Sequence, residues 1–148
     1  MGYDVHYLIV GDGDDRGRLE ALARMTAVSD RVHFLGPIGL TDLIETYRAA
    51  DLFVLPSTGE GFGIAYLEAM ASGTGALGFG VAGAIDALGD GELGAITSEL
   101  ELVTTIAFLL DQERPVPGEL SRSVRTRFGR ESFLASTRKL FDRLAESV

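Results

Sequence analysis

Two kinds of segment alternate along the chain. Short, nearly uninterrupted apolar runs lie at residues 5–10, 32–35 and 52–55, and each stops at a glycine or a proline. Such runs are typical of strands in a parallel sheet, and the run at 52–55, which shows no polar alternation, predicts a central strand covered on both faces. Between the runs, apolar residues recur every three or four positions, which predicts helices. Strands alternating with helices indicate βαβ units and a parallel sheet.

Several predicted helices begin or end at residues that favour such positions. Thr41 is a suitable N-cap for the helix after the second strand, and Gly73 is placed to end the helix that begins near residue 64. Ser98 and Glu101 have the spacing of a capping box, in which two side chains satisfy backbone amides at the start of a helix.

The second half of the chain contains weaker signals. A strand is predicted near residues 76–77, a short helix at 85–88, a last strand at 94–96 and a helical extension over 119–148. The apolar face of the final helix consists of Phe133, Leu134, Leu140, Phe141 and Leu144. Residues 1–148 are therefore expected to form a single α/β domain, Rossmann-like, with three layers and a mostly parallel sheet.

Composition restricts the classes of function. The 148 residues suit one domain, and the formal net charge of −9 repels phosphate backbones, so no nucleic acid is expected as a partner. There is no cysteine, which excludes disulfides and thiolate metal sites, and the two histidines, His6 and His33, lie within apolar runs. No apolar stretch approaches the roughly 18 residues of a transmembrane segment, and no signal peptide is recognised. A soluble, cytoplasmic domain without a metal site is expected.

The turn after the first strand superficially resembles a dinucleotide-binding loop. Its glycines, Gly11, Gly13 and Gly17, lie where a strand passes into a helix. The same turn carries the carboxylates of Asp12, Asp14 and Asp15. These charges would repel a pyrophosphate, and no acidic residue ends the second strand to bind a ribose, so NAD is not expected. The spacing of a calcium-binding loop is also missing, and a solvated acidic turn is the better interpretation.

The loop at residues 57–63 carries the most informative chemistry. It contains three glycines and Glu60, follows the third strand, and leads into a helix with Glu68 in its second turn. Ligands of parallel sheets bind where loops leave the carboxyl ends of the strands. Glycines let backbone amides approach a ligand, and the start of a helix favours a phosphate or a sugar oxygen. Isolated glutamates are usually no more than exposed side chains, but the glycines between these two favour a ligand site.

At these residues the sequence resembles a known family. The segments at 49–57, 60–63 and 68–73 are similar to the donor-binding, C-terminal domain of retaining glycosyltransferases of family 4. The signature of that family, two glutamates separated by seven residues, is matched by Glu60 and Glu68. The resemblance extends from about residue 8 to about residue 110. It implies one half of a GT-B fold, in which two Rossmann-like domains border the active site.

The resemblance also implies roles for individual residues. Glu60 would bind hydroxyls of the donor hexose as the catalytic residue, Glu68 would bind the ribose, and the segment after Gly36 would border the base. The implied donor-binding residues are Gly11, Gly36, Pro37, Ile38, Glu60, Gly61, Phe62, Gly63, Ile64 and Glu68, with the amides of residues 62–64 facing the sugar and the distal phosphate. Such enzymes take a hexose from a nucleotide sugar, such as a UDP- or GDP-hexose, retain the anomeric configuration and need no metal or other cofactor. The chemistry depends on positioning and on stabilising the departing negative charge.

The sequence departs from the family's pattern in several places. It lacks an acceptor domain of roughly 150 residues and the family's first βα unit, which carries an arginine and a lysine for the diphosphate. The only lysine is Lys139 in the last helix, and Arg16 and Arg18 stand in the wrong place to be substitutes. Smaller departures occur at Gly75, Ala82 and Asp86. The chain is therefore expected to be a fragment with little or no transfer activity of its own.

Other classes of function stay open at the sequence level. A non-catalytic relative, retained as a binding or assembly module, agrees with the acidic charge and the missing basic pair. A nucleotide-sugar epimerase of the related GT-B group is disfavoured because the acid, base and histidine groups it would use are not evident. An oxidoreductase is disfavoured by the acidic turn. The expected partners are a nucleotide sugar and the missing acceptor domain, and peripheral association of the full protein with a membrane stays open.

Overall fold

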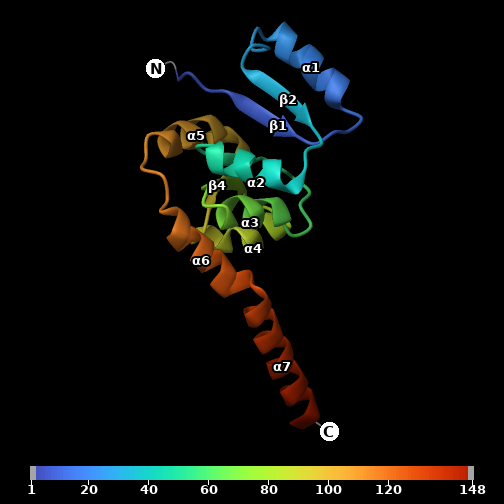
Figure 1. Cartoon of the computed structure of the whole chain (residues 1–148), viewed down its shortest axis with the longest axis vertical. Helices are drawn as coiled ribbons and strands as arrows, with labels where there is room; N and C mark the ends of the chain where they lie inside the picture. The colour runs from blue at the N-terminus through green and yellow to red at the C-terminus, as the bar shows by residue number, and fades with distance from the viewer. Residues whose placement is uncertain (1–2, 147–148) are drawn as a thin grey trace. The chain divides into compact units, whose positions relative to one another are not determined.

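The computed structural model describes residues 3–146, in which strands and helices alternate (Figure 1). By its contacts the chain divides into two compact units, Met1–Glu45 (unit 1) and Thr46–Val148 (unit 2). Unit 1 contains β1 (Tyr7–Val10), α1 (Arg16–Met25) and β2 (Val32–Gly36), and α2 (Leu40–Ala49) crosses the boundary. Unit 2 contains β3 (Phe53–Leu55), α3 (Ile64–Ala71), β4 (Ala76–Phe79), α4 (Ala82–Ala87), β5 (Ala95–Thr97), α5 (Leu102–Leu110), α6 (Pro117–Phe128) and α7 (Arg130–Glu146), with 3-10 turns at Gly89–Gly91 and Glu99–Glu101.

The described strands pair in parallel, which confirms the α/β class. β1 pairs with β2, with Leu8 opposite His33, whereas β3, β4 and β5 pair in that order. The five strands therefore form two sheets instead of the predicted single sheet. The expectation of a central strand at 52–55 is also wrong, because β3 is an edge strand with partly buried side chains and β4 is central.

Small residues explain why β4 gives only a weak strand signal although it lies in the centre of its sheet. Ala76 and Leu77 are buried, and Gly78 lies directly beneath the ring of Tyr66. A Cβ atom at Gly78 would lie 2.5 Å from the Tyr66 hydroxyl oxygen, so the tight packing requires glycine. Alanine and glycine add little to a hydrophobic pattern even where they are fully buried.

Two predicted helix starts differ in detail from the structure. α2 begins at Leu40, and the Gly39 carbonyl accepts the Leu43 amide at 2.9 Å, so Thr41 lies inside the first turn and is not the N-cap. The Ser98 hydroxyl donates to the Glu101 carboxylate at 2.9 Å, with no side-chain bond from Ser98 to a backbone amide. The capping residues thus mark the right region, but their side chains bond to each other.

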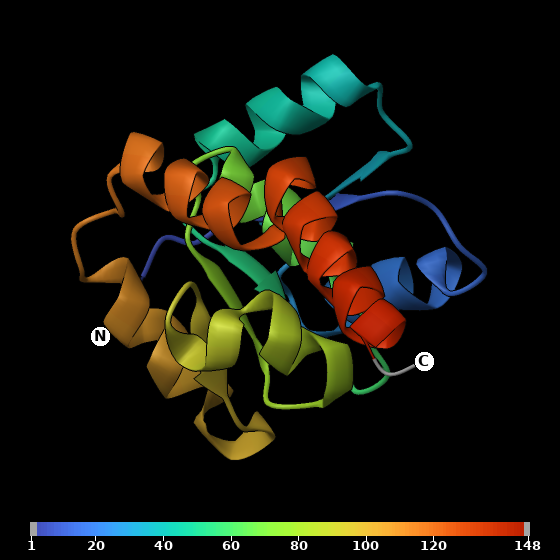
Figure 2. The ribbon, with the colours of Figure 1, turned by 90° about the horizontal axis from the view of Figure 1, so that it is seen from below.

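The core of unit 2 lies between α3, α4 and α6 and the sheet. The largest fully buried side chains are those of Tyr66, Met70, Leu77 and Leu88. α6 belongs to this core, because Leu120 and Val124 are buried and α6 packs along α3 (Figure 2). The first helix of the predicted extension is therefore a structural part of unit 2.

α7 follows α6 after Gly129 and runs away from the sheet (Figure 1). The five apolar residues predicted for one face of this helix are all exposed: Phe133, Leu134, Leu140, Phe141 and Leu144. Within residues 3–146, no side chain packed in the core cluster of unit 2 comes from α7.

Unit 1 has a much smaller interior. Ala23 is the only buried hydrophobic residue in its described part, and Tyr7 and Leu8 of β1 are nearly half exposed. His6 and His33 lie in apolar runs of the sequence, yet both are exposed, and their ring nitrogens are 2.9 Å apart. Sequence hydrophobicity therefore overstates the burial of β1.

Candidate functional site

The glycine loop, which we define as residues 57–63, leaves the carboxyl end of β3 and enters α3. Glu60 is partly buried, and its Oε1 accepts a hydrogen bond from the Gly63 amide at 3.1 Å. Gly63 has φ of +86°, and a Cβ atom there would lie 2.6 Å from the Tyr66 ring. The loop therefore reaches α3 through a backbone conformation that only glycine adopts without strain, and this conformation gives Glu60 its amide partner.

The same loop rests directly on the start of α4. The Gly83 amide donates to the Glu60 carbonyl at 3.3 Å. A Cβ atom at Gly83 would lie 2.4 Å from the Gly61 carbonyl oxygen and 2.4 Å from the Phe62 Cα. Two backbone segments are thus in contact, and Gly83 makes the contact possible.

The side chains after Glu60 do not all face the same way. Phe62 packs edge-on against Phe128 at the end of α6, with ring centroids 5.9 Å apart, and is 42% exposed. Ile64 is 64% exposed at the first position of α3. The amides of residues 62–64 were predicted to face the sugar and the distal phosphate. In the structure the Gly63 amide instead bonds to the Glu60 carboxylate.

A chain of aromatic rings lies beneath the loop and α3. Phe53 of β3 meets Tyr47 of α2 on one side and Tyr66 of α3 on the other, edge-on, at centroid distances of 5.6 and 5.7 Å. The Tyr66 hydroxyl donates to the Leu55 carbonyl at 2.5 Å. Burial, and then the charge of Glu60, raise the pKa of Tyr66, which therefore remains a neutral donor at neutral pH.

Glu68 lies on the exposed side of α3, where it meets a buried tyrosine. The Tyr47 hydroxyl donates to Glu68 Oε2 at 3.2 Å. Burial, followed by the Glu68 charge and this hydrogen bond, raises the pKa of Tyr47 to about 12. Tyr47 was not singled out from the sequence in the helix predicted after the second strand. The available signal was that tyrosine on the apolar stripe of a helix carries a hydroxyl that needs a partner when buried.

The predicted site residues of unit 1 gather at the ends of its two strands. The Gly11 amide donates to the Gly36 carbonyl at 2.8 Å, so the loops that follow β1 and β2 are joined. Pro37 and Ile38 continue from Gly36 toward α2. The structure brings Gly11 and Gly36 together within unit 1, and it brings Glu60, Gly63 and the start of α3 together within unit 2.

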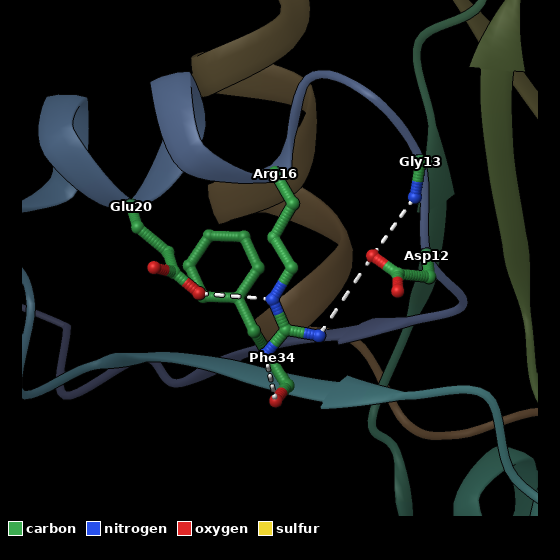
Figure 3. A network of polar contacts seen from close by, with 5 residues as sticks. All are labelled: Asp12, Gly13, Arg16, Glu20 and Phe34. Carbon is green, nitrogen blue, oxygen red and sulfur yellow. Dashed lines mark hydrogen bonds and ion pairs between the residues drawn. The ribbon is translucent and has the colours of Figure 1, made fainter.

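Arg16 organises the acidic turn of unit 1 (Figure 3). Its Nε donates to Glu20 at 2.9 Å, its Nη2 donates to the Phe34 carbonyl at 3.4 Å, and its Nη1 lies 3.9 Å from Asp12. Asp12 in turn accepts the Gly13 amide at 2.9 Å. The guanidinium also lies 5.8 Å from the centre of the Phe34 ring. Arg16 thus fastens α1 to β2 and is already surrounded by two carboxylates.

Two kinds of feature are absent from the described part of the chain. Within residues 3–146, no group of three or more histidine, cysteine, aspartate or glutamate side chains is arranged to hold a metal ion. Over the same range, no helix has the length and apolar character needed to cross a membrane.

Comparison with known proteins assigns the chain to a family. Residues 1–128 match the family described as "Glycosyl transferases group 1". A D-inositol 3-phosphate glycosyltransferase of Catenulispora acidiphila is 34% identical over 135 residues, which cover 88% of this chain and 32% of that protein. A 2-deoxystreptamine glucosyltransferase of Streptomyces kanamyceticus is 34% identical over 122 residues, covering 80% of this chain and 32% of that protein. The chain therefore spans about a third of the length of these relatives.

Solved structures show the same fold. Sucrose-phosphate synthase of Thermosynechococcus elongatus superposes with a TM-score of 0.77 at 28% identity, covering 95% of this chain and 39% of that chain. The Anabaena protein Alr3699/HepE, solved in complex with UDP-glucose, superposes with a TM-score of 0.77 at 22% identity, covering 99% of this chain and 42% of that chain. The fold matches domains of GT-B glycosyltransferases. With the family match over residues 1–128, this chain belongs to the group 1 glycosyl transferases.

Proposed function

We propose that this chain is the donor-binding part of a retaining glycosyltransferase of family 4, which transfers a hexose from a nucleotide sugar to an acceptor. The observation that carries the proposal is that Glu60 and Glu68 occupy one loop–helix segment at the carboxyl end of β3, each held by a defined hydrogen bond. This edge of a parallel sheet is where ligands bind. The group 1 match and the UDP-glucose complex of Alr3699/HepE support a nucleotide-sugar ligand.

The hydrogen bond between Glu60 and Gly63 suggests how a donor would enter. We propose that an oxygen of the distal phosphate replaces the Glu60 carboxylate at the Gly63 amide, beside the positive end of the α3 dipole. The released carboxylate then accepts hydrogen bonds from hydroxyls of the hexose, and Glu68 accepts hydrogen bonds from the ribose. The backbone near Gly61, Phe62 and Ile64 completes the sugar side.

Unit 1 carries the other residues that the family resemblance implies for the donor. The loops that carry Gly11 and Gly36, joined by a hydrogen bond, are proposed to border the base with Pro37 and Ile38. The paired guanidinium of Arg16 is not proposed as a diphosphate ligand, because Glu20 and Asp12 already neutralise it. Stabilisation of the departing phosphate would then come from backbone amides and the helix dipole, without a metal ion.

An NMR titration with UDP, GDP, ADP and NAD at millimolar concentrations, with EDTA present, tests the proposal. We expect one nucleoside diphosphate to shift the amides of the glycine loop and the start of α3, and NAD to shift none of them. Glu68→Ala should raise the dissociation constant and leave binding measurable, because it removes the proposed ribose acceptor. Glu131→Ala, which alters an exposed glutamate in the first turn of α7, is the matched control and should respond like the unmodified chain.

Two outcomes would contradict the proposal. If the chain responds to none of the three diphosphates, it does not bind the donor as proposed. If the purified chain transfers sugar efficiently to a defined acceptor, it is more than the donor-binding part of an enzyme.

A second candidate is a non-catalytic binding or assembly module of the same fold. It is favoured by the pairing of Arg16 with Glu20 and Asp12, which takes up a positive charge near the proposed base site. A nucleotide affinity that Glu68→Ala leaves unchanged would support this module against the transferase.

A further inference from the structure

We propose that Tyr47 is a positioning residue for Glu68, whose carboxylate it holds in the orientation that binds the ribose of a nucleotide. The inference rests on the proposed function, because that function gives Glu68 its ligand. Tyr47 belongs to α2 and Glu68 to α3, so the contact joins residues 21 positions apart within unit 2.

In this pair the hydrogen-bond donor, Tyr47, is buried, and the acceptor, Glu68, lies on an exposed helix face. Tyr47 is 9% exposed, and its hydroxyl lies 3.2 Å from Glu68 Oε2. A glutamate on an exposed helix face has several rotamers available, and ordering it for a ligand costs conformational entropy. A hydrogen bond from a fixed hydroxyl at one oxygen reduces that freedom in advance, and lone pairs of the other oxygen can accept ribose hydroxyls.

Tyr47 is itself held from two other directions. Its ring meets Phe53 edge-on, with an interplanar angle of 78°. Its backbone carbonyl accepts the hydroxyl of the buried Thr74 at 2.5 Å. The position of the hydroxyl is thus fixed by the core of unit 2, and the core in turn sets the position of the Glu68 carboxylate.

The state of the phenol agrees with this role. Burial and the neighbouring carboxylate raise the pKa of Tyr47 to about 12, so the hydroxyl carries its proton throughout the neutral range. Tyr47 is then a permanent donor to Glu68, and phenylalanine in its place would keep the ring packing and remove the donor.

A double-mutant cycle tests the inference with UDP, GDP and ADP as probes. We compare the unmodified chain with Tyr47→Phe, Glu68→Ala and the double variant. Tyr47→Phe should raise the dissociation constant of the bound diphosphate about five- to tenfold, the loss expected for one net hydrogen bond. In the Glu68→Ala background the same change should have no effect. An unchanged dissociation constant for Tyr47→Phe, or an equal loss in both backgrounds, would overturn the inference.

Two controls separate positioning from general stability. Thr97→Val removes the hydrogen bond between the hydroxyls of the buried Thr97 and of Thr105 and leaves the contacts of Tyr47 intact, so it should lower stability while affinity stays within about twofold. Tyr66→Phe removes a hydroxyl from another buried tyrosine, one that bonds to the Leu55 carbonyl, and should also leave affinity within about twofold. A loss of affinity in both controls as large as in Tyr47→Phe would show a structural role only.

A measurement without nucleotide keeps the inference separate from the proposed function. The Tyr47 phenol, followed by NMR of its ring carbon during a pH titration, should titrate lower in Glu68→Ala than in the unmodified chain, since the carboxylate contributes to its raised pKa. An unchanged Tyr47 titration would show that the two side chains are not coupled and would overturn the inference. If the pair is coupled but none of the diphosphates binds, the proposed function fails, and the positioning role in ribose binding fails with it.

Discussion

Gly83 supports the glycine loop because it has no side chain. Gly83→Ala would place a methyl group 2.4 Å from the Gly61 carbonyl oxygen, so the loop would have to move off α4. We expect the free energy of unfolding to fall by about 2 kcal/mol, the usual cost of forcing extra volume into a tight contact. Urea unfolding would measure this loss. NMR titration should show weaker nucleotide binding as well.

Gly59→Ala is the matched control for this prediction, since it lies in the same loop and its added methyl group would meet nothing within 4 Å. We expect a change in unfolding free energy of less than about 0.5 kcal/mol, as for most surface substitutions. Equal losses for the two variants would show that close approach at Gly83 does not hold the loop.

Tyr47 also makes stability depend on alkaline pH. Its pKa is raised from the ordinary tyrosine value of 10.0 to about 12 in the folded chain. The folded state therefore holds the proton more tightly, and the resulting stability is complete below about pH 10 and is lost as pH rises toward about 12. As the pH rises over this range, we expect the free energy of unfolding to fall by about 2 kcal/mol more in the unmodified chain than in Tyr47→Phe.

Urea unfolding at about pH 9 and about pH 11.5 measures this difference. Tyr66 also has a raised pKa, so the comparison must be made between the variant and the unmodified chain. If the free energy of unfolding falls equally with pH in Tyr47→Phe and in the unmodified chain, the raised pKa of Tyr47 does not contribute to stability and the prediction is contradicted.

At the scale of elements, the strongly patterned segments could be predicted and the small-residue ones only in part. β1, β2, β3 and α3 occur within two residues of their predicted bounds, because apolar runs and Gly73 mark them. The central position of β4 could not be predicted, since Ala76 and Gly78 carry little hydrophobic signal although both are buried, Gly78 against Tyr66. Burial of this kind depends on neighbours distant in the sequence.

The candidate site shows the same division. The glycines and the apolar pattern predicted a loop with Glu60 followed by a helix with Glu68 in its second turn, and the structure has both elements at those positions. The roles of the two glutamates stay predictions. The hydrogen bonds from Gly63 and Tyr47 could not be predicted, because one needs a left-handed glycine and the other a contact between α2 and α3.

At the scale of the whole molecule, the two units differ in the amount of buried apolar surface. Unit 1 has a two-stranded sheet, which is marginal by itself, and Ala23 is its only buried hydrophobic residue among those described. We expect amides of β1 and β2 to exchange with solvent at least about 30-fold faster than those of β4, since local opening follows local packing. Hydrogen exchange followed by NMR measures both sets in one experiment. Equal protection would contradict the difference.

Phe128 is both the ring on which Phe62 of the glycine loop packs and the last residue of the family match. A protein trimmed after Gly129 would keep this ring and shed the exposed apolar side chains of α7. Trimming one turn further back would remove the support of the loop. The safe place for a fluorescent label, a purification tag or a fusion partner is therefore determined by an aromatic contact at the loop, and it lies immediately beyond α6.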